Sequence, residues 1–191
     1  MKSFEARKSS GGSPQRIILG VTGSIAAYKG ADLASALVKG GYEVNVVMTK
    51  AGAALASPLT FQALTKNRVF TDVLQEDDPG RIVHVDLPQK HADILLIAPA
   101  SANIIAKIAW GLADDMLSSM VLATPAATPK IIAPAMNTLM YENPATQQNI
   151  EVLKNRGWVV VEPREARLAC GYVGKGALAL VETIVEAVQN V

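Results

Sequence analysis

From Arg16 onward, short runs of β-branched and apolar residues alternate with longer segments in which apolar residues recur at helical spacing. This alternation is typical of βαβ units, in which a parallel sheet is covered by helices on both faces. It predicts an α/β fold, a single three-layer Rossmann-like or flavodoxin-like domain with a parallel sheet flanked by helices. The predicted strands are Arg16–Thr22, Glu43–Met48, Asp93–Ala98, Lys130–Ala133 and Trp158–Val161, with a weaker one near Arg81–Val83.

The length of 191 residues fits one domain, which we place at residues 16–191. Residues 1–15 carry charges, Ser and Gly without an apolar stretch, so they are interpreted as a flexible tail and not as a secretory signal. The longest apolar runs are far shorter than the ~20 residues that cross a bilayer. We therefore expect no membrane association.

Charge and cysteine content narrow the classes of partner. The 18 Lys and Arg side chains nearly balance 17 Asp and Glu, without a basic stripe, which argues against a nucleic-acid partner and favours a small molecule or another protein. The single cysteine, Cys170, cannot form an intrachain disulfide, so a reducing cytoplasm is expected. Nothing with metal-ligand spacing accompanies it, and no metal is expected.

Segments rich in Gly, Pro, Ser and Asn follow the predicted strands, at the edge of the sheet where such folds bind ligands. In the first, a strand passes through Gly23 and Ser24 into a helix, a turn that suits a phosphate. Its structural alternative is a tight βα turn with Ser24 as the N-cap. The segment matches neither G-x-G-x-x-G nor a Walker A loop, so neither a dinucleotide nor a nucleoside triphosphate is indicated.

Two further segments each allow a functional and a structural interpretation. In PASAN, residues 99–103, the small side chains together with Ser101 and Asn103 could bind a flat ring. The structural alternative is a capped helix with Asn103 in its first turn. In PAMN, the amide of Asn137 could hold a carboxylate, or else form a turn.

The only thiol and one histidine are also candidates. Cys170 lies in a loop punctuated by Gly171, Gly174 and Gly176, as in a mobile flap over an active site, although a lone cysteine is more often a buried apolar residue. His84 interrupts an apolar run at the end of the weak strand and could act as a base near neutral pH, or could be structural.

Together and in order, these segments resemble the flavin-containing cysteine decarboxylases over about Arg16 to Val188. The resemblance rests on TGSIAAYK, HVDL, PASAN, PAMNTLMY and ACGYVGKGA. It implies an FMN-dependent lyase that decarboxylates 4'-phosphopantothenoylcysteine to 4'-phosphopantetheine in coenzyme A biosynthesis. It also implies a homotrimer, or a dodecamer built from trimers, with active sites between subunits.

The resemblance further implies roles for individual residues. His84, Asn137 and Cys170 would form the catalytic set, with His84 as base or electrostatic partner, Asn137 on the carboxylate and Cys170 as proton donor. Arg167, Leu168 and Ala169, with Asn137, would hold the substrate. The residues expected against FMN are Gly23, Ser24, Ile25, Thr49, Ser101, Asn103 and Ala135.

Three alternatives stay open at this point. The chain could decarboxylate the C-terminal cysteine of a peptide, but the flap thiol of Cys170 favours a small-molecule substrate. A flavin prenyltransferase would share the fold, although PAMN and Cys170 count against it. A non-catalytic regulatory flavoprotein of the same fold would typically carry a long acidic extension, which this sequence lacks.

Overall fold

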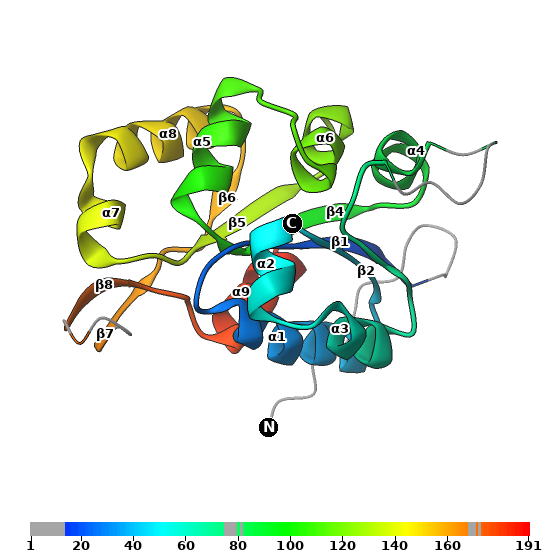
Figure 1. The fold of residues 1–191 in the computed structure, drawn as a ribbon, viewed down its shortest axis with the longest axis horizontal. Helices are drawn as coiled ribbons and strands as arrows, with labels where there is room; N and C mark the ends of the chain where they lie inside the picture. Colours follow the sequence, from blue (N-terminus) through cyan, green and yellow to red (C-terminus); the bar gives the residue numbers. More distant parts are fainter. Residues whose placement is uncertain (1–13, 75–79, 81, 168–170, 172) are drawn as a thin grey trace.

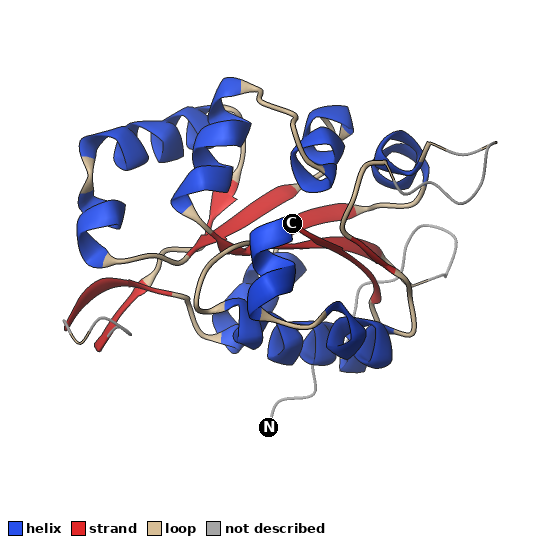
Figure 2. Cartoon of the chain, viewed as in Figure 1, coloured by secondary structure: helices blue, strands red, loops and turns tan. Residues whose placement is uncertain are grey.

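The computed structural model describes residues 14–74, 80, 82–167, 171 and 173–191. It confirms the parallel α/β architecture: one six-stranded sheet has the order β3-β2-β1-β4-β5-β6, and a separate two-stranded sheet joins β7 and β8 (Figures 1 and 2). The strands are β1 Arg16–Val21, β2 Glu43–Met48, β3 Val69–Phe70, β4 Ile94–Ala100, β5 Lys130–Pro134, β6 Val159–Val160, β7 Arg164–Arg167 and β8 Val173–Ala177. The helices are α1 Ala27–Lys39, α2 Lys50–Leu55, α3 Pro58–Thr65, α4 Val83–Lys90, α5 Ala102–Trp110, α6 Met116–Ala123, α7 Thr138–Glu142, α8 Pro144–Asn155 and α9 Val181–Gln189.

Alternate side chains of the central strands enter two separate apolar cores, because successive residues of a strand point to opposite faces. Ile17 and Leu19 of β1 pack with α1, α3 and α9, whereas Ile18 packs with α4, α5, α6 and α8. Every residue of β4 is buried, as expected for a strand covered on both faces. Figure 1 shows the two helical layers on opposite sides of the sheet.

Five predicted strands are present, with small shifts at their ends. Glu43–Met48 is a strand over the predicted range, whereas the other four differ by one or two residues at one or both ends. The weak strand near Arg81–Val83 is wrong, because Val83 begins α4. Val83 and Leu87 are one helical turn apart and both enter the core with α5 and α6, so tertiary burial favours a helix here.

Three strands were not predicted, namely β3, β7 and β8. The sixth strand of the sheet is β3, which pairs in parallel with Val46 and Val47 at the edge. The glycine-rich segment expected to be a loop contains β8, paired antiparallel with β7. β3 is only two residues long, and glycines depress strand propensity in β8, so local sequence gives little signal for either.

The predicted tail, residues 1–15, falls mainly outside the described residues. Of its last two residues, Gln15 accepts a hydrogen bond from the Glu43 N–H through its carbonyl oxygen (3.0 Å). None of the described helices has the length and apolar character that a bilayer crossing requires.

An ion pair joins Arg16, the first residue of β1, to Asp93, which immediately precedes β4, at the sheet edge remote from the strands' carboxyl ends. The Arg16 guanidinium donates to both carboxylate oxygens of Asp93 (2.9 and 3.2 Å), and the Arg16 N–H donates to the same side chain (2.8 Å). The Asp93 N–H in turn donates to the Arg16 carbonyl oxygen (2.8 Å). Hydrogen bonds from Arg16 hold the pKa of Asp93 below its ordinary value of 3.8, against the opposing effect of burial.

We expect Asp93→Asn to destabilise the fold by about 1–3 kcal/mol at pH 7, because a charge-assisted bidentate pair is lost. Since the pKa of Asp93 is lowered by folding, its contribution is present above pH 4 and is lost as the pH falls through the folded-state pKa. Urea unfolding of both proteins at several pH values measures the difference. A difference that does not shrink below pH 4 would contradict the assignment.

Candidate active site

The carboxyl ends of β1 and β4 lie side by side, at the point where strand order reverses in the sheet. From β1 the chain continues outward to β2 and β3, whereas β5 and β6 lie on the other side of β4. Connections leave in opposite directions at such a point and open a crevice, which is where α/β folds bind ligands. The loops that leave β1, β4 and β5 build the candidate site.

A buried hydroxyl connects the first two of these loops. Thr22, which follows β1, is 1% exposed, and its Oγ1 donates to the Pro99 carbonyl oxygen at 2.7 Å. The same oxygen accepts from the Ser101 N–H at 2.9 Å. Because both bonds are buried or partly buried, they fix the turn after β1 against the start of α5.

The turn after β1 is built from Gly23, Ser24, Ile25 and Ala26. A Cβ on Gly23 would lie 2.5 Å from the Cβ of Ala51, so only glycine fits there. Ser24 Oγ accepts from the Ala26 N–H at 3.3 Å. The N–H groups of Gly23 and Ile25 donate to no described residue, so they are donors that the turn can offer to an anion.

The prediction that Ser24 is the N-cap of the first helix is wrong. α1 begins at Ala27 and its N-cap is Ala26, without a side-chain cap. Ser24 instead folds the preceding turn, since its N–H donates to the Thr22 carbonyl oxygen and its own carbonyl oxygen accepts from Ala27 (both 2.8 Å). The extra turn moves the helix start away from β1.

Ser101 and Asn103 lie where the capped-helix interpretation placed them. Ser101 is the N-cap of α5 and its Oγ accepts from the Ile104 N–H at 3.4 Å. Asn103 is in the first turn of α5. Ser101 also lines the cavity described below, so one side chain caps a helix and borders the site.

Asn137 follows β5 and is the N-cap of α7. Its Oδ1 accepts from the Leu139 N–H at 2.9 Å, which orients the amide. The neighbouring Met136 N–H donates to the Gly176 carbonyl oxygen of β8, also at 2.9 Å. The turn-forming role is therefore present, and the amide NH₂ is the group of Asn137 whose chemistry suits a carboxylate.

The β7–β8 hairpin supplies two arginines to the site. Arg164 Nε donates to the Leu178 carbonyl oxygen at 3.1 Å, and Arg167 is exposed at the end of β7. Side chains three residues apart on a regular strand face opposite sides. A register shift between Arg164 and Glu165 interrupts the ladder, and both arginines line the same cavity.

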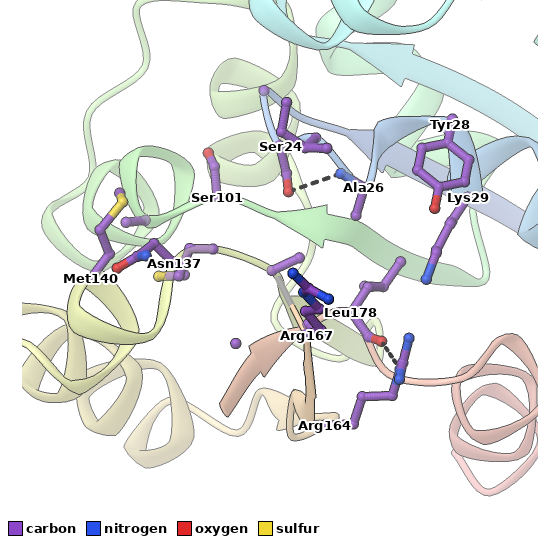
Figure 3. Close-up of a pocket in the computed structure, with 17 residues that line it drawn as sticks. Ser24, Ala26, Tyr28, Lys29, Ser101, Asn137, Met140, Arg164, Arg167 and Leu178 are labelled. Atoms are coloured by element: carbon purple, nitrogen blue, oxygen red, sulfur yellow. Dashed lines mark hydrogen bonds between the residues drawn. The ribbon is translucent and has the colours of Figure 1, made fainter. Parts of the chain in front are cut away.

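These loops and the hairpin enclose a cavity of about 610 Å³, within the range of small-molecule sites. In Figure 3, Ser24 and Ser101 lie on one side of it and Arg164 and Arg167 on the other. Among the described residues that line it, three are basic and none is Asp or Glu. The lining is Gly23, Ser24, Ile25, Ala26, Tyr28, Lys29, Ser101, Ala102, Ala135, Met136, Asn137, Met140, Arg164, Arg167, Gly176, Ala177 and Leu178.

The cavity brings together Gly23, Ser24, Ile25, Ser101, Ala135, Asn137 and Arg167 from the predicted set. Thr49, His84 and Asn103 do not line it. Thr49 is the N-cap of α2, and its N–H donates to the Val21 carbonyl oxygen at 3.1 Å, close to the turn after β1. His84 lies in the first turn of α4, which packs on α6. Leu168, Ala169 and Cys170 lie outside the described residues.

Sequence reasoning missed several residues of the site. Lys29 belongs to the TGSIAAYK motif. Its position shortly after the predicted phosphate-binding turn could have indicated that its cation faces the site. Thr22 interrupts an apolar run at its carboxyl end, which marked a buried polar group. Arg164 gave no local signal, because only the register shift in the hairpin turns it toward the cavity.

Comparisons with known proteins agree on one family. The family model described as "Flavoprotein" matches residues 5–191. The "Probable phosphopantothenoylcysteine decarboxylase" of Streptococcus mutans is 52% identical over 92% of this chain and 98% of its own length. The "Coenzyme A biosynthesis bifunctional protein CoaBC" of Bacillus subtilis is 47% identical over 92% of this chain, which spans only 43% of that protein.

Solved structures resemble the whole described fold. A mutant "PPC decarboxylase" complexed with pantothenoylaminoethenethiol has a TM-score of 0.83 and 33% identity, covering 93% of this chain and 97% of its own. "The FMN binding protein AtHal3" has a TM-score of 0.79 and 34% identity, covering 92% and 95%.

We expect Thr22→Val to lower the free energy of unfolding by about 1–3 kcal/mol, because it leaves the Ser101 N–H without its acceptor. Thr22→Ser keeps the hydroxyl and should lose less. Thr65→Val is a matched control, since the Thr65 hydroxyl bonds only within and just beyond its own helix. Urea denaturation measures the free energy of unfolding of all three variants. An equal decrease in Thr22→Val and Thr65→Val would show that the bond between the two loops adds no more stability than a local bond within a helix.

Proposed function

The chain belongs to the flavoprotein family, and we propose that its cavity holds FMN beside 4'-phosphopantothenoylcysteine and performs the decarboxylation of that substrate. The protein is an FMN-dependent decarboxylase of coenzyme A biosynthesis, the reaction product being 4'-phosphopantetheine. Its length corresponds to the decarboxylase relative of Streptococcus mutans. The chain spans less than half the length of the bifunctional relative of Bacillus subtilis.

The observation that carries this function is the charge of the cavity. Lys29, Arg164 and Arg167 line it, and the part of the lining that the structure describes holds no acidic residue. FMN brings one phosphate, and the substrate brings a phosphate and a carboxylate, so both ligands are anionic. Opposite charges attract more strongly in a partly desolvated cavity than in water. The basic lining therefore favours the binding of both FMN and the substrate.

The residues present also fit the cofactor itself. The Gly23 and Ile25 N–H groups, with Ser24 between them, form a cradle for a single phosphate. We propose that Ser101 and Ala135 face the ring system, where a small side chain allows close approach. Thr49 and Asn103 lie beside these loops, and we propose that they also contact FMN.

Bound FMN supplies a hydride acceptor, which allows the thiol-bearing carbon of the substrate to become a thioaldehyde and later to be reduced again after CO₂ is lost. We propose that the NH₂ group of Asn137 and the guanidinium of Arg167 hold the substrate carboxylate and orient it for bond cleavage. Leu168 and Ala169 are retained as substrate contacts from the resemblance.

Two proton transfers complete the proposed mechanism. His84 takes the proton of the substrate thiol, or stabilises the thiolate, as the carbon is oxidised. Cys170 gives a proton to the carbon that lost CO₂, next to the sulfur-bearing carbon, in the final reduction, which suits a thiol of ordinary pKa ~8.5 better than a hydroxyl. Both roles come from the family resemblance.

We further propose that the active form is a homotrimer, or a dodecamer of trimers, with active sites between subunits. The support is the placement of His84, which belongs to the proposed catalytic set but does not line the cavity that contains Asn137. A neighbouring subunit could contribute the missing side chain. Light scattering of the purified protein tests this assembly.

We also propose that the enzyme works in the cytoplasm. Its proposed mechanism needs the Cys170 thiol in the reduced state, which a reducing compartment maintains. Cell fractionation with a tagged chain tests the location.

The purified protein should be yellow and should release FMN, not FAD, when it is denatured. Incubated with 4'-phosphopantothenoylcysteine, it should form 4'-phosphopantetheine and CO₂, since the substrate matches the anionic groups that the cavity accommodates. Chromatography of the released flavin and mass spectrometry of the product measure both outcomes. A peptide ending in cysteine is the comparison substrate, and faster turnover of the peptide would contradict the proposed substrate.

Asn137→Asp should retain FMN but lower kcat/KM by on the order of 10²-fold, because a carboxylate repels the substrate carboxylate and lacks the amide donor. Since Asp can also cap α7, the fold should be preserved. Steady-state kinetics together with the visible flavin spectrum measure the effect. Full activity of this variant would assign the carboxylate to another group, with Arg167 as the next candidate.

A further inference from the structure

The β7–β8 hairpin forms one wall of the cavity but is not part of the six-stranded sheet. Its position must therefore be set by other contacts. Figure 1 shows β8 beside α7, and the two elements are in contact. Since α7 begins directly after Asn137, this contact decides how the arginines of the hairpin lie relative to the amide across the cavity.

Backbone contacts bring the two elements close together but leave their attachment narrow. The Met136 N–H donates to the Gly176 carbonyl oxygen at 2.9 Å, and this is the single backbone hydrogen bond between the described residues of these segments. A Cβ on Gly174 would lie 2.5 Å from Thr138 Oγ1, so the close approach depends on glycine. One backbone bond leaves the hairpin free to pivot unless side chains restrain it.

Three side chains supply that restraint at the outer side of the contact. Tyr141 of α7 is 5% exposed, and its hydroxyl donates to Glu162 Oε2 at 2.6 Å. Lys175 of β8 pairs with the same oxygen at 2.9 Å. The Lys175 ammonium also lies 5.4 Å from the centre of the Tyr141 ring, in range of a cation–π contact.

The buried phenol distinguishes this cluster from an ordinary surface ion pair. Glu162 and Lys175 are each nearly half exposed, so their pair alone would contribute little. The bond from Tyr141 is charge-assisted and short, and its phenol is buried. Burial and the nearby Glu162 together raise the pKa of Tyr141 to about 12, so it remains a donor at neutral pH.

The same cluster reaches back to the segment that carries Asn137. The Tyr141 N–H donates to the Asn137 carbonyl oxygen at 2.9 Å. Tyr141 is thus bonded through its backbone to the residue proposed to hold the substrate carboxylate, and through its hydroxyl to the anchor of β8. Lys154 of α8 approaches Glu162 only at 3.7 Å and pairs more closely with Glu151.

We propose that Tyr141, Glu162 and Lys175 form a latch that fixes the β7–β8 hairpin against α7 and so sets the position of Arg164 and Arg167 relative to Asn137. The latch residues are positioning residues, since none of them lines the cavity. The inference rests on the proposed function for its kinetic consequence. Its structural consequence, restraint of the hairpin, can be measured without substrate.

Tyr141→Phe removes the hydroxyl donor, and Glu162→Gln removes the carboxylate charge that both Tyr141 and Lys175 contact, while both changes nearly keep side-chain size. Glu151→Gln is the matched control, because Glu151 also pairs with Lys154 but contacts neither Tyr141 nor β8. We expect backbone amide exchange in peptides covering 136–142 and 173–177 to be at least about tenfold faster in both latch variants and unchanged in the control. Hydrogen exchange of the FMN-loaded protein, followed by mass spectrometry, measures this.

In the same variants, KM for 4'-phosphopantothenoylcysteine should rise about five- to tenfold, the effect of losing one charge-assisted bond, with FMN affinity unchanged within twofold. Lys175→Arg keeps the cation, so this single variant should have values near those of the wild type. Lys175→Met removes the cation and should behave like the other latch variants. Latch variants that exchange like Glu151→Gln would overturn the latch even if the wild type is fully active. A wild type without decarboxylase activity would instead overturn the proposed function, while the exchange result would still decide the latch.

Discussion

The hydroxyl of Thr22 is the interaction on which the geometry of the site depends. It is buried at the carboxyl end of β1, and it bonds to both the Pro99 carbonyl oxygen and the Ser101 N–H. A parallel sheet aligns its strands but does not determine how the loops beyond them lie, because loops contribute no ladder hydrogen bonds. One buried donor and acceptor therefore fixes the proposed phosphate-binding turn against the helix that borders the proposed flavin site.

The opposite wall of the cavity is held by a different kind of contact. The β7–β8 hairpin lies outside the main sheet and attaches through a glycine-dependent close approach and one backbone bond to Gly176. Beyond these backbone contacts, the proposed latch of Tyr141, Glu162 and Lys175 restrains this wall from the outer side, whereas the buried bonds of Thr22 hold the other wall directly. The division suits an enzyme that retains its cofactor through every turnover but must admit and release a substrate.

Much of the fold and part of the site followed from the sequence. The strand pattern is strong where both faces are buried, as in β4, where every residue is apolar or small and alternation is absent. It fails at Val83, where one apolar run suits a strand locally but helical burial with Leu87 is available in the folded chain. The turn at Gly23, the capped helix start at Ser101 and the turn at Asn137 were all predicted, because each lies within three residues of the end of a strand.

The sequence by itself determined the parallel α/β layers, the edge of the sheet that carries the site and the family, since these depend on local periodicity and on motifs contiguous in the chain. Only the tertiary structure decided which polar and charged side chains line the cavity together. Lys29, Asn137 and Arg164 come from three separate segments, and their convergence depends on strand order and on a register shift in β7. It also decided that His84 does not line this cavity, because α4 forms as a helix packed on α6. Long-range packing sets such placements, and no local pattern encodes the distance between segments that meet only after folding.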